Sequence, residues 1–98
     1  MAITREDKDG NIALRIEGAL SIYEAAALRG EILSCLEEDT GLELDLEGVT
    51  ECDTAGLQLL WAARKTAAEA KKALHIVNTP QPVLDALQGA GLRSEEPF

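Results

Sequence analysis

The stretch that decides the fold lies in the middle of the chain and reads Leu44-Asp45-Leu46-Glu47-Gly48-Val49-Thr50-Glu51-Cys52-Asp53-Thr54-Ala55-Gly56-Leu57. Its first part alternates leucine with acidic residues, a pattern that predicts a strand with one buried face. The segment 55–73 is rich in alanine and ends in Lys71 and Lys72, which suit the negative end of a helix dipole. The stretch therefore predicts a strand, a short loop and a helix that begins near Thr54.

Alternation and turn signals predict the other strands. Apolar residues alternate along 12–16 after the turn signal Asp9-Gly10-Asn11, and a short strand around 3–5 completes a hairpin that Gly18 ends. Residues 74–77 are β-preferring and predict one more strand.

Two further helices are indicated by their first residues. Ser21-Ile22-Tyr23-Glu24 matches the capping box, and apolar residues then recur at helical spacing until Asp39-Thr40-Gly41. Thr79-Pro80 supplies a cap and a proline for the start of the last helix, which Gly89 or Gly91 ends.

The element order is thus strand, strand, helix, strand, helix, strand, helix. Strands separated by single helices imply crossover connections and a partly parallel sheet, and the opening hairpin makes the sheet mixed. We expect an α/β fold with a mixed, four- to five-stranded sheet packed with helices. Residues 1–92 are predicted to form one domain and residues 93–98 a loose C-terminal tail.

The charge balance restricts the binding partners. The chain has 98 residues and a formal net charge of −9, so its surface repels phosphate backbones and anionic membranes. No apolar signal segment follows Met1 and no stretch approaches the roughly 18 apolar residues of a membrane span. We expect a cytoplasmic protein that neither binds nucleic acid nor inserts into a membrane.

Residue types that carry catalysis are sparse. His75 is the only histidine, and neither a P-loop, a dinucleotide-binding glycine pattern nor a nucleophile elbow occurs. Cys35 and Cys52 are interpreted as small buried side chains in a reducing compartment rather than as a disulfide or metal pair. The sequence predicts no catalytic residue, no metal site and no cofactor, and hence a protein that is not an enzyme.

The segment from Asp53 to Leu57 has two interpretations from its local chemistry. In the first, Asp53 or Thr54 is only the N-cap of the following helix, and Gly56 lets that helix pack closely. In the second, Thr54 is a phosphorylation site, because a phosphate at a helix start meets unpaired N–H groups and a favourable dipole. Asp53 beside it would make the local field still more negative.

The same stretch resembles the central signature of STAS domains, the family of the anti-sigma-factor antagonists. In that family a "Leu-x-Leu" strand is followed by "Asp-Ser/Thr-x-Gly-Leu" and a helix, which residues 44–57 match. Gly18-Ala19-Leu20 is similar to the family's "Gly-x-Leu" before its first helix. The segment from Thr79 to Leu92 is similar to the closing "Ser/Thr-Pro-x-x-Val … Gly-Leu" helix, so the resemblance covers nearly the whole chain.

The resemblance implies a protein-interaction switch in bacterial signal transduction and transcription regulation. Thr54 takes the position that is phosphorylated in the antagonists, and Asp53, Ala55 and Gly56 form the switch loop around it. The implied partner is an anti-sigma factor or another histidine-kinase-like serine/threonine kinase, which phosphorylates the hydroxyl and so releases itself. This chain has threonine where many antagonists have serine, and Ser21 where many have aspartate.

Two alternatives stay open. The threonine form also occurs in relatives that are constitutive accessory subunits of lipid-trafficking ABC transporters, which would make an ABC transporter ATPase the partner and Thr54 a fixed contact. The helix start could instead hold a nucleotide or an anion.

The helical wheel adds a predicted docking face. Leu59, Leu60 and Ala63 share the arc that should face the sheet, and Trp61 falls off it. We expect the partner to contact a face made of Leu57, Gln58, Trp61 and Lys65, together with Ser21. Trp61 is either an exposed anchor for the partner or packs at the rim of the core, and the sequence leaves both open.

Overall fold

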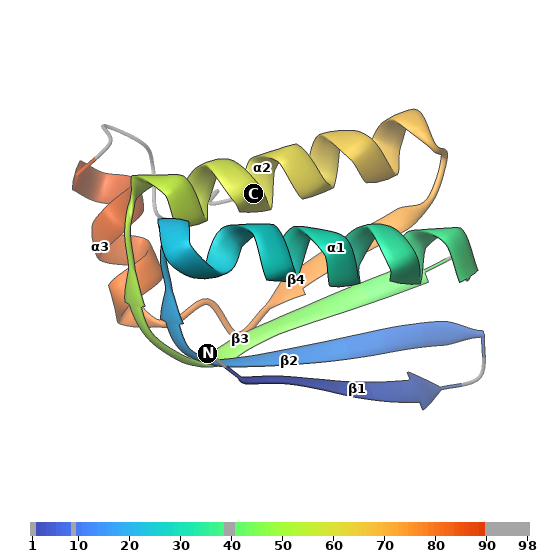
Figure 1. Ribbon diagram of the computed structural model, residues 1–98, viewed down its shortest axis with the longest axis horizontal. Helices are drawn as coiled ribbons and strands as arrows, with labels where there is room; N and C mark the ends of the chain where they lie inside the picture. The colour runs from blue at the N-terminus through green and yellow to red at the C-terminus, as the bar shows by residue number, and fades with distance from the viewer. Residues whose placement is uncertain (1, 9, 39–40, 90–98) are drawn as a thin grey trace.

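Strands and helices alternate along the chain in the order predicted from the sequence. The computed structural model describes residues 2–8, 10–38 and 41–89. The elements are β1 (Ala2–Lys8), β2 (Asn11–Leu20), α1 (Ile22–Glu38), β3 (Gly41–Cys52), α2 (Thr54–Glu69), β4 (Ala73–Val77) and α3 (Gln81–Gly89). Helices α1 and α2 lie side by side over the sheet (Figure 1), and α3 packs against β3 and α2.

The four strands form one mixed sheet in the order β1-β2-β3-β4. The β1–β2 hairpin is antiparallel and turns at Gly10, whose φ of +86° is a conformation that glycine adopts without strain. The β2–β3 and β3–β4 pairs are parallel, with Leu14 opposite Leu44 and Leu44 opposite Ile76. Parallel neighbours require crossover connections, and α1 and α2 provide them. The predicted mixed sheet is confirmed, with four strands.

The core lies between the sheet and the helices. Alternate side chains of β2 and β3 point toward the helices and are buried, as the alternation in the sequence predicts. Among the described residues, no polar or charged side chain is buried. The buried apolar side chains from the sheet are Ile12, Leu14, Ile16, Leu20, Leu42, Leu44, Leu46 and Val49, and those from the helices include Leu28, Ile32, Cys35, Leu57, Leu60, Ala63, Ala67, Val83 and Leu87.

Several element ends differ from the sequence prediction, beginning with β1, which runs from Ala2 to Lys8 and not only around 3–5. β2 continues past Gly18 to Leu20, and β3 continues to Cys52, because the two extensions pair with each other across a bulge. α2 ends at Glu69 and not near residue 73, because Lys71 takes a left-handed φ of 58° that breaks the helix. The predicted tail at 93–98 and the alternative helix end at Gly91 lie outside the described residues.

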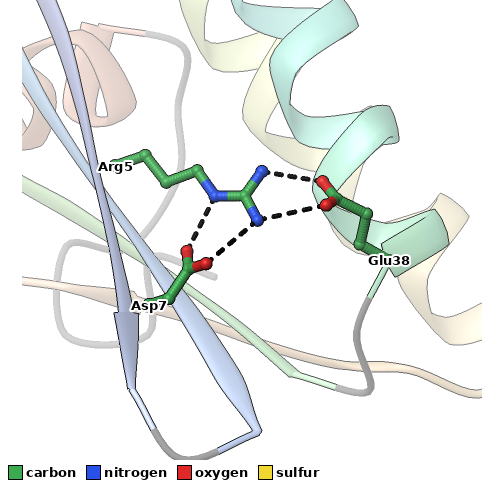
Figure 2. Close-up of polar contacts among 3 residues, drawn as sticks. All are labelled: Arg5, Asp7 and Glu38. Carbon is green, nitrogen blue, oxygen red and sulfur yellow. Dashed lines mark hydrogen bonds and ion pairs between the residues drawn. The ribbon is translucent and has the colours of Figure 1, made fainter.

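An ion-pair cluster fastens the edge strand β1 to the end of α1 (Figure 2). The Arg5 guanidinium lies 2.7 Å from a Glu38 carboxylate oxygen and 2.8 Å from Asp7 Oδ1. Hydrogen bonds from Arg5 hold the pKa of both carboxyl groups below their ordinary values of 3.8 and 4.5. Carboxylates of this kind stabilise the fold fully above their ordinary pKa, and the contribution is lost as the pH falls below about 4.

Candidate functional site

The two parallel strands β2 and β3 end side by side, and both crossover helices begin there (Figure 1). Leu20 is the register partner of Cys52, and the Asp53 N–H donates to the Leu20 carbonyl at 3.2 Å. Two helix N-termini, each with the positive end of a helix dipole, are therefore neighbours. This junction is the candidate functional site.

The Asp53 carboxylate connects the two helix starts. Asp53 is the N-cap of α2 with an extended backbone, and its Oδ1 accepts from the Gly56 N–H at 2.8 Å. Its Oδ2 accepts from the Ile22 N–H, at the first residue of α1, at 3.2 Å. The predicted capping of α2 by Asp53 is confirmed. The second bond joins residues that are 31 positions apart, and no local sequence signal indicates it.

Thr54 is the first residue of α2, and its side chain is exposed to solvent. It follows Asp53 directly, so its backbone lies at the junction of the two helix starts. The neighbouring Asp53 carboxylate already accepts from two N–H groups.

Gly56 permits the close approach of α2 to the end of β2. A Cβ atom at this position would lie 2.5 Å from the Leu20 carbonyl oxygen and 3.2 Å from the Cys52 sulfur. Backbone cannot yield as a flexible side chain can, so only glycine fits without a shift of the helix. The close packing predicted for Gly56 is confirmed, and it brings the start of α2 against the end of β2.

Both cysteines are free thiols. Cys35 is buried in the core, and Cys52 is half-buried with its thiol 3.6 Å from the Asp53 carbonyl. Burial, and to a lesser extent the Asp53 charge, raises the pKa of the Cys52 thiol to about 11. A thiol of that pKa is protonated at neutral pH and is a poor nucleophile. The interpretation as a small buried side chain is confirmed for Cys35, whereas Cys52 is only half-buried.

Only some residues of the predicted docking face are exposed to solvent. Leu57 is 1% exposed and belongs to the core, so its place on that face is wrong. Its side chain lies three residues before buried Leu60 and shares that arc of α2. Gln58 and Lys65 are exposed, while Trp61 is half-buried and packs against the core, which favours the rim interpretation.

The remaining predicted site residues flank the junction. Ser21 and Ala55 are half-buried at the starts of α1 and α2, and the Ser21 carbonyl accepts from the N–H groups of Glu24 and Ala25. His75 is exposed on β4. In the part of the chain that the structure describes, no three His, Cys, Asp or Glu side chains gather as metal ligands would, and no helix is long and apolar enough to span a membrane.

Sequence analysis missed two residues at the junction. Ile22 and Tyr23 are the large apolar side chains that the described structure leaves exposed, at 65% and 90%. The sequence pattern assigned them to the capping box, where their role is backbone geometry. The available signal was two large apolar residues directly after a cap, outside the apolar stripe of their own helix.

Comparisons with known proteins agree with this architecture. The family model described as "Mlab, STAS domain" matches residues 3–94, so the chain belongs to the STAS domain family. No curated protein matches the sequence.

Solved structures share the fold at low sequence identity. An anti-sigma factor antagonist from Mycobacterium paratuberculosis is 21% identical with a TM-score of 0.79, and the match covers 92% of this chain and 77% of that one. The antagonist SpoIIAA in its unphosphorylated form is 18% identical with a TM-score of 0.75, over 93% and 82% of the two chains. SpoIIAA from Bacillus in its phosphorylated form is 17% identical with a TM-score of 0.72, over 93% and 85%. The expected STAS fold of the antagonist type is confirmed.

Proposed function

We propose that this chain is a cytoplasmic protein-interaction switch of the anti-sigma-factor-antagonist type, controlled by phosphorylation of Thr54. The partner is an anti-sigma factor or another histidine-kinase-like serine/threonine kinase, and any catalysis belongs to that partner. The observation that carries the proposal is the exposure of Thr54 at the junction where α1 and α2 begin. That SpoIIAA, which has the same fold, exists in a phosphorylated and an unphosphorylated form supports it.

The electrostatics of the junction explain how one phosphate could release a partner. A phosphate on Thr54 adds roughly −1.5 to −2 charges at neutral pH. The segments 16–28 and 46–63 contain no lysine or arginine that could pair with it inside the chain. Within these two segments the new charge meets no cation, and its repulsion acts on an anionic group of the partner. In a kinase, the group that faces Thr54 is the nucleotide that donated the phosphoryl group. The remaining phosphates of that nucleotide and the phosphate on Thr54 are both negative and repel each other.

Variants of Thr54 test the switch. We expect Thr54→Ala to bind the partner that co-purifies with the wild type about as tightly as the wild type does. Thr54→Glu places a permanent charge in the interface and is expected to weaken binding by roughly tenfold or more. Affinity is measured by calorimetry with the purified partner. Ser34→Glu, which adds the same charge at an exposed residue of α1 far from the junction, is the control and should bind normally.

The alternatives give other results in the same experiment. If Thr54→Ala alone weakens the complex, Thr54 is a fixed contact, as in a constitutive subunit of an ABC transporter ATPase, and the switch is wrong. Thermal-shift measurements with nucleotides and inorganic phosphate test the anion-binding alternative. A ligand-induced rise in the melting temperature of the wild type that differs in size in Asp53→Ala would favour anion binding at the helix start.

A further inference from the structure

Two adjacent apolar side chains stand in solvent at the first turn of α1. Ile22 is 65% and Tyr23 is 90% exposed, and they are the exposed large apolar side chains of the described residues. Exposed apolar surface gains free energy when a partner covers it, and tyrosine is enriched among the residues that dominate binding energy. We call Ile22 and Tyr23 the α1 tip.

The α1 tip belongs to the same surface as Thr54. The Ile22 N–H donates to Asp53 Oδ2, and Asp53 directly precedes Thr54. Both helices start at this end of the molecule (Figure 1). A protein that docks over Thr54 therefore lies close to the first turn of α1, where the α1 tip is exposed.

The charges around the α1 tip define the chemistry of that face. Segments 16–28 and 46–63, which include the ends of β2 and β3 and the starts of α1 and α2, hold five acidic residues and no basic ones. Glu51 and Asp53 are exposed there, and Glu24 lies in the first turn of α1. A partner that covers these carboxylates without cost needs cationic groups opposite them.

On the basis of the proposed function, we infer that the α1 tip anchors the kinase partner, whose docking face offers an apolar pocket for Tyr23 with lysine or arginine side chains at its rim. The anchor also explains why a phosphate is disruptive. A water-excluding contact around Ile22 and Tyr23 would force the phosphate on Thr54 to lose its hydration, which costs far more than in an open, polar contact.

Variants of Tyr23 test the anchor with the partner that co-purifies with the wild-type chain. Tyr23→Ala is expected to raise the dissociation constant at least about tenfold, and Tyr23→Phe to keep it within about threefold. The melting temperature should not change, because Tyr23 is 90% exposed. Arg64→Ala, which truncates a long exposed side chain further along α2, is the control. Affinity should also fall as salt is raised, because the rim contacts are ionic.

The results separate this inference from the proposed function. If Thr54→Glu releases the partner and both Tyr23→Ala and Ile22→Ala bind like the wild type, the switch holds and the anchor is wrong. If Tyr23→Ala weakens binding and Thr54→Glu does not, the anchor holds and the switch is wrong. Affinity that does not depend on salt would contradict the basic rim.

A second measurement needs no purified partner. p-Benzoylphenylalanine is placed at position 23 or, as the control, at position 64 of the full chain, and the cells that make it are irradiated. We expect an adduct at position 23 with the same kinase that co-purifies with the wild type, and none at position 64. The lack of an adduct at position 23 would overturn the inference.

Discussion

Replacing Gly56 by alanine is expected to lower the free energy of unfolding by about 2 kcal/mol, although alanine is the better helix former. The added Cβ would lie 2.5 Å from the Leu20 carbonyl oxygen and 2.9 Å from Leu20 Cγ. Relief requires α2 to move away from the end of β2, which disturbs both the Asp53 cap and the Thr54 position. Chemical denaturation with both the midpoint and the slope determined measures the change.

The same substitution at Gly30 is the matched control. Gly30 lies in α1, is exposed, and has no atom within 4 Å of an added Cβ. Gly30→Ala should therefore raise the free energy of unfolding by roughly 0.5–1 kcal/mol, the difference in helix propensity. If Gly56→Ala were as stable as Gly30→Ala, the close approach at the switch loop would be refuted.

Replacing Asp53 by alanine is expected to destabilise the fold by about 2 kcal/mol, because one carboxylate caps two helices. The substitution leaves the Gly56 N–H and the Ile22 N–H without the acceptor that each has in the native fold. Asp53→Asn should lose less stability than Asp53→Ala. An amide oxygen can still accept at α2, but the amide nitrogen cannot accept from Ile22.

Glu51→Ala is the control for charge near the junction. Glu51 is exposed at the end of β3 and its removal should change stability by no more than about 0.5 kcal/mol. Equal stability of Asp53→Ala and Glu51→Ala would show that neither the bond from Ile22 nor the bond from Gly56 to Asp53 contributes to stability. Thermal and chemical denaturation of Asp53→Ala, Asp53→Asn and Glu51→Ala measure these differences in stability.

The sequence was sufficient to predict the elements because their signals are local. Alternating leucines at 42–46 and the cap at Asp53 each act within a few residues, and the structure confirms both. The extension of β3 to Cys52 was not predictable in this way. It depends on pairing with the end of β2, 32 positions earlier in the chain, and the segment 47–52 has no alternation that would indicate a strand.

In the candidate site, too, local features were predictable from the sequence and features that depend on tertiary structure were not. The sequence offered Asp53 or Thr54 as the N-cap and predicted close packing at Gly56, because such residues suit a helix start, and the structure confirms the packing and makes Asp53 the cap. Leu57 was placed with Trp61, four residues on, when it belongs with Leu60, three residues on, and a wheel without the sheet cannot decide between the two. The exposure of Tyr23 also depends on tertiary structure, since only the position of the sheet determines which turn of α1 stays uncovered.

The central claim is that phosphorylation of Thr54 controls binding, and it is tested most directly by mass spectrometry of Thr54 in two pools of the protein. The chain is purified from its native cells and separated into the fraction bound to partners and the free fraction. The account predicts unmodified Thr54 together with a histidine-kinase-like ATPase in the bound fraction, and phosphorylated Thr54 in the free fraction. Unmodified Thr54 in both fractions, in a stoichiometric complex with a transporter ATPase, would contradict it and make the chain a fixed subunit.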